Sequence, residues 1–178
     1  MTQSDILIVD DTPANLTVLS NILRGEGYQV RVAPNGERAL LAAEKDTPDL
    51  ILLDINLPDI NGFEVCRKLK SDSQMTDIPI IFISALDEVD DKVEAFEAGG
   101  ADYITKPFQI REVLVRVQNQ LALRQQRQQI GASLPQLHTT LSNIQLHANK
   151  LSGDDADAIK TFINEAKDIL KDLSDLTT

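Results

Sequence analysis

The stretch LILLDINLPDINGFE, residues 50–64, opens with four consecutive apolar residues and turns acidic at Asp54. A run that is apolar at every position is typical of a central strand buried on both faces of a sheet. Pro58 marks the loop that follows, and Gly62 is expected to permit a turn there and to begin a helix. Similar short apolar runs predict five strands, at residues 5–9, 28–32, 49–53, 78–83 and 101–104.

Between the predicted strands, apolar residues recur every three or four positions, as in amphipathic helices. Gly25, Gly27 and Gly99 are expected to stop helices. Alternating strands and helices, with strands apolar on both faces, predict a doubly wound α/β fold with a parallel sheet covered on each side by helices. Ligands of such sheets bind beyond the carboxyl ends of the strands.

Three acidic residues stand where predicted strands end. Asp10 and Asp11 follow the first strand, and Asp54 ends the third. A parallel sheet brings these carboxylates to one edge, where they repel one another unless a cation joins them. Hard oxygen ligands suit Mg2+, so the pattern predicts a magnesium site. The alternative is that all three are ordinary solvated loop acids.

Several separated motifs resemble, in their order along the chain, those of bacterial two-component response-regulator receiver domains. They are ILIVDD at 6–11, the acidic stretch at 50–64, IIFISA at 80–85 and DYITKPF at 102–108. The resemblance covers residues 5 to about 122 and implies a flavodoxin-like receiver with a five-stranded parallel sheet. It implies that Asp54 accepts a phosphoryl group, and that Asp10, Asp11, Asp54 and the backbone carbonyl of Asn56 hold Mg2+. Such a receiver is no conventional enzyme, although it catalyses its own phosphorylation and dephosphorylation.

The same resemblance gives roles to residues at the ends of the last two strands. It implies that the Ser84 hydroxyl and the Lys106 ammonium each contact a phosphoryl oxygen, which stabilises charge during transfer. It also makes Tyr103 a switch, whose ring moves inward when the hydroxyl of Ser84 shifts toward the phosphoryl group. Alternatively, Ser84 and Lys106 are ordinary surface residues, and Tyr103 is an ordinary aromatic residue of a strand. Cys66 is expected to pack on a helix without a reactive thiol.

From Phe108 onward the pattern is wholly helical. LALRQQRQQIG, residues 121–131, loses apolar content and predicts an exposed helical connector, with Gly131 as a possible break. Beyond it, two apolar stripes with alternating steps of three and four predict the two helices of a hairpin, joined through SGDD at 152–155. The stripes are Ile130, Leu134, Leu137, Leu141, Ile144, Ala148 and Leu151, and then Ile159, Phe162, Ala166, Ile169, Leu173 and Leu176.

A two-helix hairpin of about 45 residues buries too little apolar surface to be stable alone. Its heptad spacing favours pairing with a second copy in a four-helix bundle, and packing back on the first domain is the alternative. Its segments 133–144 and 163–177 resemble, more weakly, the dimerisation and phosphotransfer hairpin of histidine kinases. Pro135 stands where that family has its phosphorylated histidine, which implies a degenerate hairpin kept for pairing and partner recognition. His138 or His147 could instead serve a phosphorelay.

Charge and composition limit the partners. With 17 basic and 28 acidic side chains, the net charge of −11 repels nucleic acid. The charged residues after position 130 are also mainly acidic, so no direct nucleic-acid-binding output is expected. The single cysteine excludes a disulfide framework within the chain. No run of about 18 apolar residues and no signal-peptide layout are found, so we expect a cytoplasmic protein without membrane insertion.

The sequence therefore predicts three regions: a receiver domain at 1–123, a helical connector at 124–132 and a dimerising, partner-binding hairpin at 133–178. A cognate histidine kinase or phosphotransfer protein is expected to phosphorylate Asp54. Phosphorylation would then change homodimerisation, or the binding of a downstream protein partner, through the hairpin.

Overall fold

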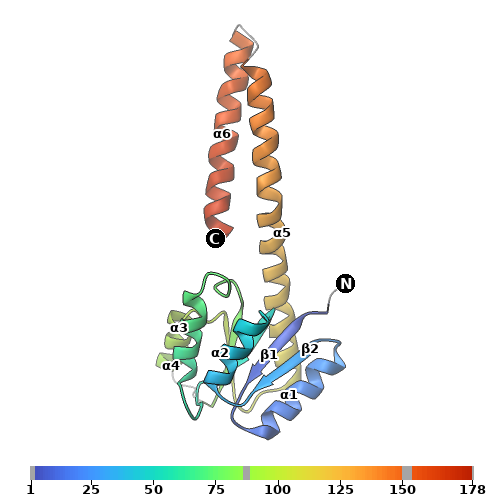
Figure 1. Ribbon diagram of the computed structural model, residues 1–178, viewed down its shortest axis with the longest axis vertical. Helices are drawn as coiled ribbons and strands as arrows, with labels where there is room; N and C mark the ends of the chain where they lie inside the picture. Colours follow the sequence, from blue (N-terminus) through green and yellow to red (C-terminus); the bar gives the residue numbers. More distant parts are fainter. Residues whose placement is uncertain (1–2, 86–88, 150–153, 178) are drawn as a thin grey trace. The chain divides into compact units, whose positions relative to one another are not determined.

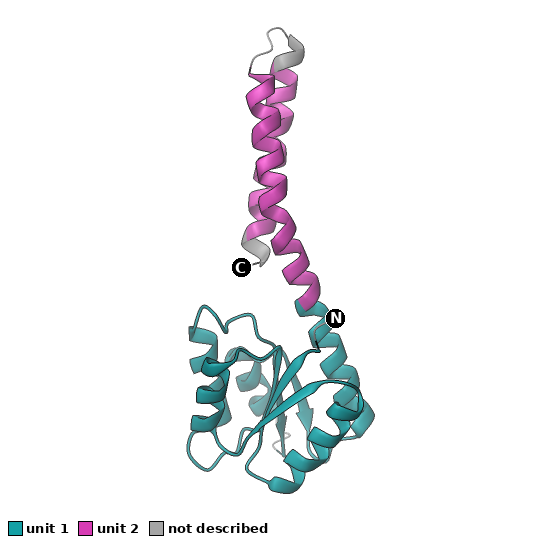
Figure 2. Cartoon of the chain, turned by 45° about the vertical axis from the view of Figure 1, so that its right-hand side comes forward, with its two compact units in different colours: residues 1–124 teal, residues 125–178 magenta. Residues whose placement is uncertain are grey.

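The computed structural model describes the backbone of residues 3–85, 89–149 and 154–177 (Figure 1). The chain divides into two compact units, Met1–Arg124 and Gln125–Thr178 (Figure 2). The first unit contains the sheet and the second is helical, and each is described by itself below.

The sheet of the first unit has five parallel strands in the order β2-β1-β3-β4-β5. The predicted doubly wound α/β fold is confirmed, and every strand lies within two residues of its predicted range. The strands are β1 (Asp5–Val9), β2 (Gln29–Ala33), β3 (Leu50–Leu53), β4 (Ile80–Ser84) and β5 (Asp102–Thr105).

Helices cover both faces of this sheet (Figure 1). Alternate residues of β1 pack into two separate cores: Ile6 and Ile8 lie with α1 and α5, whereas Leu7 and Val9 lie with α2, α3 and α4. Because both faces are covered, every position of the central strand β3 is apolar and buried. The helices are α1 (Pro13–Gly25), α2 (Gly36–Lys45), α3 (Gly62–Ser71), α4 (Val89–Glu97) and α5 (Ile110–Ala148).

Glycines end two of these helices, as predicted. The first helix ends at Gly25, and Gly27 then has a φ of 89°; Gly99, two residues after α4, has a φ of 97°. A positive φ of this size is the left-handed conformation that glycine adopts without steric cost.

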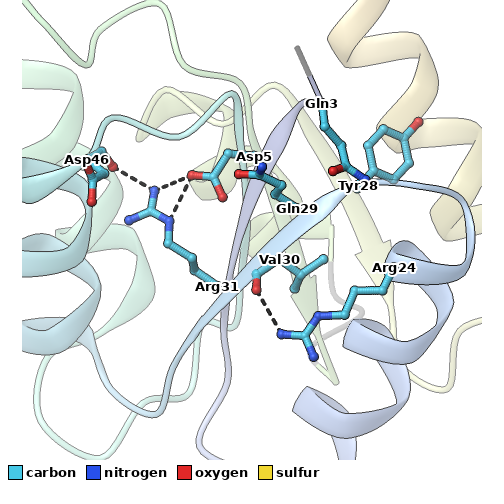
Figure 3. A pocket seen from close by; sticks show the side chains of 8 residues that line it. All are labelled: Gln3, Asp5, Arg24, Tyr28, Gln29, Val30, Arg31 and Asp46. Atoms are coloured by element: carbon cyan, nitrogen blue, oxygen red, sulfur yellow. Dashed lines mark hydrogen bonds and ion pairs between the residues drawn. The ribbon is translucent and has the colours of Figure 1, made fainter. Parts of the chain in front are cut away.

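Arg31 forms hydrogen bonds that link β2 to the amino end of β1 and to the end of α2 (Figure 3). Arg31 on β2 donates from Nε to Asp5 Oδ2 on β1 at 2.8 Å, and its other nitrogens donate to the carbonyl oxygens of Ala42 and Asp46 at 2.7 Å each. These carbonyls belong to the end of α2, where helices leave acceptors unsatisfied. Arg31 therefore joins two strands to the end of α2, at the edge of the sheet opposite the acidic residues.

Cys66 on α3 is fully buried, and its thiol donates to the carbonyl oxygen of Ala98 at 3.2 Å. Burial raises the pKa of this thiol to about 11. An unfolded cysteine has a pKa of about 8.5, so at about pH 8 folding reduces the reactive thiolate fraction by roughly two orders of magnitude.

We therefore expect native protein to resist a thiol-alkylating reagent at that pH and to react stoichiometrically once unfolded in urea, as measured by intact mass. Rapid stoichiometric modification of the native protein would contradict the buried position of Cys66.

The second unit consists of the later part of α5 and of α6 (Asp154–Thr177). The possible break at Gly131 is wrong, because α5 continues through both Gly131 and Pro135. A glycine costs a helix interior only about 1 kcal/mol relative to alanine, which neighbouring turns can offset. Within the described ranges, no helix combines the length and apolar content that crossing a membrane requires.

In the second unit α5 and α6 lie side by side (Figures 1 and 2). Gln145 donates to the Asn164 side chain at 3.4 Å and accepts from Lys167, while a groove near the start of the unit joins Leu134 to Leu173. The end of α5 thus lies beside the middle of α6, whereas Leu134, earlier in α5, lies near Leu173 toward the end of α6, so the two helices run antiparallel.

The face of α6 that packs on α5 differs from the predicted stripe. Ile163 and Leu170 are 2% and 8% exposed, whereas Phe162 and Ile169 of the stripe are 71% and 60% exposed. Much of the stripe that heptad spacing selected therefore lies uncovered within one chain. Leu151, the residues joining the two helices at 152–153 and the side chain of Leu176 lie outside the described part of the chain.

Candidate functional site

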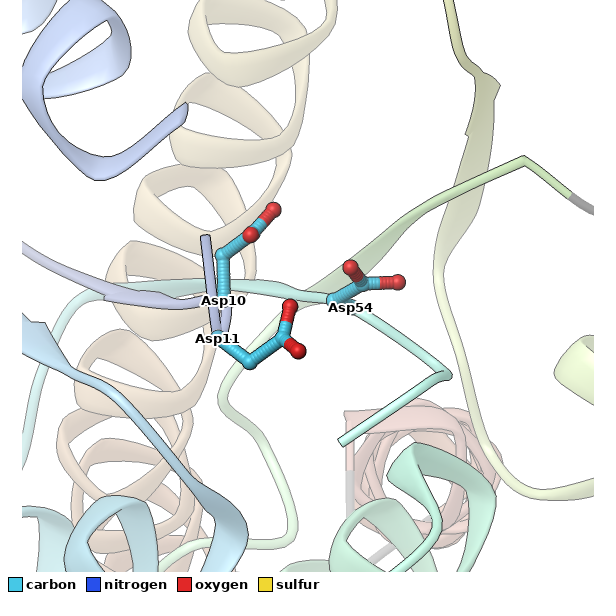
Figure 4. A group of neighbouring side chains, drawn as sticks. All are labelled: Asp10, Asp11 and Asp54. Atoms are coloured by element: carbon cyan, nitrogen blue, oxygen red, sulfur yellow. The ribbon is translucent and has the colours of Figure 1, made fainter. Parts of the chain in front are cut away.

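Three carboxylates meet at the carboxyl edge of the sheet (Figure 4). Asp10 and Asp11 directly follow β1, and Asp54 directly follows β3. These strands are neighbours, with Val9 paired to Leu53, so residues one or two positions later lie close together. One oxygen from each carboxylate lies within 4.8 Å of the others. The structure thus brings together the acidic trio that the sequence pattern singled out.

Lys106 reaches the same place from β5. Its Nζ atom lies 2.8 Å from Asp10 Oδ2 and 2.5 Å from Asp54 Oδ2. The Lys106 backbone N–H donates to the carbonyl oxygen of Ser84 at 2.7 Å, and the Lys106–Pro107 peptide bond is cis. The ammonium therefore bridges two carboxylates that come from different strands.

Burial and neighbouring charges shift the pKa values of Asp54 and Lys106. Burial raises the pKa of the Asp54 carboxyl, Lys106 opposes that rise, and the charge of Asp10 adds to it. Burial alone would lower the pKa of Lys106, but the hydrogen bonds and negative charges of Asp10 and Asp54 outweigh it and raise the pKa. Buried carboxylates of this kind need positive charge nearby.

Ser84 and Asn56 also lie at this edge, whereas Tyr103 lies within β5. Ser84 ends β4 and is fully buried, and Asn56 is exposed with its backbone N–H 3.3 Å from Asp54 Oδ1. Tyr103 is 7% exposed and packs in the core on the α2–α3–α4 side of the sheet. Asp10, Asp54 and Ser84 are three of the four buried polar residues in the part of the chain that the structure describes. Buried polar side chains are thus concentrated at this edge, as expected of a functional site.

Sequence reasoning missed two neutral groups that hold Asp10. The Thr12 backbone N–H donates to Asp10 Oδ1 at 2.8 Å, and the Asn15 side-chain amide lies 3.0 Å from both Asp10 oxygens. Asn15 is the third residue of α1, a position whose side chain can reach back to the residues before the helix. The sequence could have indicated this contact, because Pro13 is typical of a helix start and places Asn15 in the first turn, five residues after Asp10.

The loop that carries Asp54 is fixed at two points. Asp59 accepts the backbone N–H groups of Gly36 and Glu37, at 2.9 and 2.8 Å, and so caps the first turn of α2. Gly62 donates its N–H to the carbonyl oxygen of Ile55 at 2.9 Å, and a Cβ atom at Gly62 would lie 2.3 Å from the Asp54 carbonyl oxygen. Only glycine allows this close approach of α3 to the acceptor loop.

The acidic trio fits a divalent cation. Its donors are all carboxylate oxygens, the ligand type that Mg2+ prefers. Lys106 also shows that a positive group can occupy the space between Asp10 and Asp54. Asp10, Asp11 and Asp54 would hold the ion.

The two histidines lie in the second unit, on α5. His138 is half-buried, and His147 is exposed with its Nδ1 atom 2.8 Å from the Asn143 carbonyl oxygen. Neither histidine belongs to the carboxylate cluster of the first unit.

Comparison with known proteins places the first unit among characterised domains. The family model described as "Response regulator receiver domain" matches residues 6–118. The chain is 47% identical over 112 residues to the alkaline phosphatase synthesis transcriptional regulatory protein PhoP of Bacillus subtilis, covering 63% of this chain and 46% of that protein. It is 43% identical over 114 residues to the response regulator PleD of Caulobacter vibrioides, covering 64% of this chain and 25% of that protein. The matches thus span a quarter to about half of these relatives.

Solved structures give the same result. A response regulator from Chloroflexus aurantiacus is 38% identical with a TM-score of 0.66, covering 68% of this chain and 99% of that one. The receiver domain of sensor histidine kinase PA1611 from Pseudomonas aeruginosa, solved with a magnesium ion in its active site cleft, is 32% identical with a TM-score of 0.64. It covers 68% of this chain and 99% of that one.

Proposed function

Since the chain belongs to the response regulator receiver domain family, we propose that Asp54 is its phosphoacceptor and that Asp10, Asp11, Asp54 and the Asn56 carbonyl hold Mg2+. The main support for this proposal is the contact of the Lys106 ammonium with both Asp10 and Asp54. It places a positive charge beside the proposed acceptor, Asp54, and the proposed metal ligand Asp10. The donor is the phosphohistidine of a histidine kinase or phosphotransfer protein.

The chain's own residues position the transfer. An Asp54 carboxylate oxygen attacks the phosphorus, the bond from phosphorus to the donor's imidazole nitrogen breaks, and an acyl phosphate forms while the imidazole keeps the electron pair and takes up a proton. Bound Mg2+ supplies positive charge to the phosphoryl oxygens. The Lys106 ammonium neutralises a second phosphoryl oxygen and the Ser84 hydroxyl donates to a third, so positioning and electrostatics lower the barrier.

Ser84 and Tyr103 form the switch. Tyr103 pairs with Phe82 on β4, and Ser84 lies two residues after Phe82, so both side chains are on the same face of the sheet. A shift of the Ser84 hydroxyl toward the phosphoryl group changes the space beside the Tyr103 ring. Phosphorylation thereby favours one of two side-chain arrangements.

Labelling of the full chain with acetyl phosphate and Mg2+ tests the acceptor. Wild type is expected to gain one phosphoryl group by intact mass and Asp54→Ala none, because the attacking carboxylate is gone. Asp77→Ala, which removes an exposed aspartate from the loop before β4, is the matched control and should label like wild type. Equal labelling of wild type and Asp54→Ala would refute the assignment, and acid-labile label lost in His138→Ala or His147→Ala would favour the phosphorelay alternative.

The output is carried by the helical region, residues 133–178, together with Ile130, where its first apolar stripe begins. In α5, Ile130, Leu137 and Ile144 are spaced by seven residues and are 46–49% exposed. In α6, Phe162 and Ile169 have the same spacing and are 71% and 60% exposed. We call these five residues the uncovered rows. Leaving such rows in water is unfavourable, and a four-helix bundle buries each helix against two neighbours.

The partner that fits the uncovered rows is a second copy of this chain. Each chain supplies two antiparallel helices with apolar rows at heptad spacing, so a two-fold axis sets equivalent rows against each other. Phosphorylation at Asp54 then alters this homodimer or its binding of a downstream protein. The net charge of −11 argues against nucleic acid as that partner.

A further inference from the structure

Asn15 supports an inference that rests on the proposed acceptor function and extends it. Its side-chain amide nitrogen lies 3.0 Å from Oδ1 and 3.0 Å from Oδ2 of Asp10. Asn15 is half-buried in the first turn of α1, and Asp10 is 2% exposed. The amide therefore faces both oxygens of a carboxylate that is almost completely removed from water.

The donors to Asp10 differ in charge. Lys106 donates to Oδ2 at 2.8 Å, and the Thr12 backbone N–H donates to Oδ1 at 2.8 Å. A cation entering the trio repels the ammonium of Lys106, but it does not repel the neutral amide of Asn15. Asn15 and Thr12 are thus the donors that can stay in place when the ion binds.

The position of the amide also sets the plane of the carboxylate. Thr12 holds only Oδ1, so by itself it leaves the carboxylate free to turn about its Cβ–Cγ bond. Asn15, which is close to both oxygens, restricts that rotation. We propose that Asn15 is a positioning residue that orients the Asp10 carboxylate for a divalent cation.

Calorimetric titration of the full chain with Mg2+ tests this role. Removing a group that orients a metal ligand typically weakens metal binding by 10–100-fold, so Asn15→Ala is expected to raise the Mg2+ dissociation constant about tenfold. In acetyl phosphate labelling, the Mg2+ concentration for half-maximal rate should rise by the same factor, while the rate at saturating Mg2+ stays near that of wild type.

Two further variants separate positioning from folding. Asn15→Gln keeps an amide on a longer side chain and should recover part of the Mg2+ affinity. Asn35→Ala removes an asparagine that caps α2 by accepting the Arg38 N–H, and it should leave Mg2+ affinity unchanged although it also loses a structural hydrogen bond.

Wild-type Mg2+ affinity in Asn15→Ala, together with lost affinity in Asp10→Asn, would overturn the positioning role and leave the acceptor proposal intact. Absence of Mg2+ binding by wild type would overturn the acceptor proposal and this inference together.

Discussion

Gly62→Ala is expected to lower the free energy of unfolding of the first unit by about 2–3 kcal/mol, the cost of forcing an extra methyl group into a packed site. The added Cβ would lie 2.3 Å from the Asp54 carbonyl oxygen and 2.8 Å from the Ile55 Cα atom. Both are backbone atoms, which cannot rotate away as a flexible side chain can. Relief requires the acceptor loop or the start of α3 to move, so labelling of Asp54 by acetyl phosphate should slow as well.

Urea unfolding followed by circular dichroism measures this loss, and Gly25→Ala is its matched control. Gly25 ends α1, and a Cβ atom there would meet nothing within 4 Å. Replacing that glycine should be neutral or slightly stabilising, because alanine reduces the entropy of the unfolded chain. If Gly62→Ala were as stable as Gly25→Ala, the close approach of α3 to the acceptor loop would be wrong.

The double substitution Phe162→Ser with Ile169→Ser is expected to convert the proposed dimer into a monomer. The two side chains are the most exposed of the uncovered rows, so a single chain loses little packing when they become polar. A dimer would lose the apolar contacts of both copies. Sedimentation of the full chain, with and without beryllofluoride and Mg2+, measures the oligomer and whether the phosphoryl mimic changes it.

Leu41→Ser with Phe96→Ser provides the comparison in the first unit. Leu41 and Phe96 are 65% and 54% exposed, so the chemical change and the exposure are similar. This variant should remain dimeric, and both double variants should still be labelled at Asp54. The dimer interface would instead lie in the first unit if the variant at Leu41 and Phe96 were monomeric while the variant at Phe162 and Ile169 remained dimeric.

The sequence predicts the sheet well because its strands are buried on both faces. Uniform apolar runs such as ILIV before Asp10 identify the residues that are buried. Parallel strands also end at a common edge, so Asp10 and Asp11 after the first strand and Asp54 at the third were expected to converge, as they do. The place of Lys106 beside them was implied by the resemblance to receiver domains and not by the strand pattern.

Contacts that depend on how separate elements dock were not predictable in this way. Asp59 caps α2 across 23 residues of sequence, and the Asn15 contact depends on how α1 leaves the first strand. In α6 the difficulty is different: Ile163 and Leu170 repeat every seven residues, but so do Phe162 and Ile169. Spacing alone cannot decide which of two adjacent apolar rows faces α5.

The Lys106 bridge has a consequence for competition among ions. Because an ammonium already offsets part of the negative charge of Asp10 and Asp54, a sodium or potassium ion that took its place would exchange one unit charge for another and gain almost nothing. Only an ion carrying two charges improves the balance. We therefore expect Lys106 to make the site favour divalent over monovalent cations.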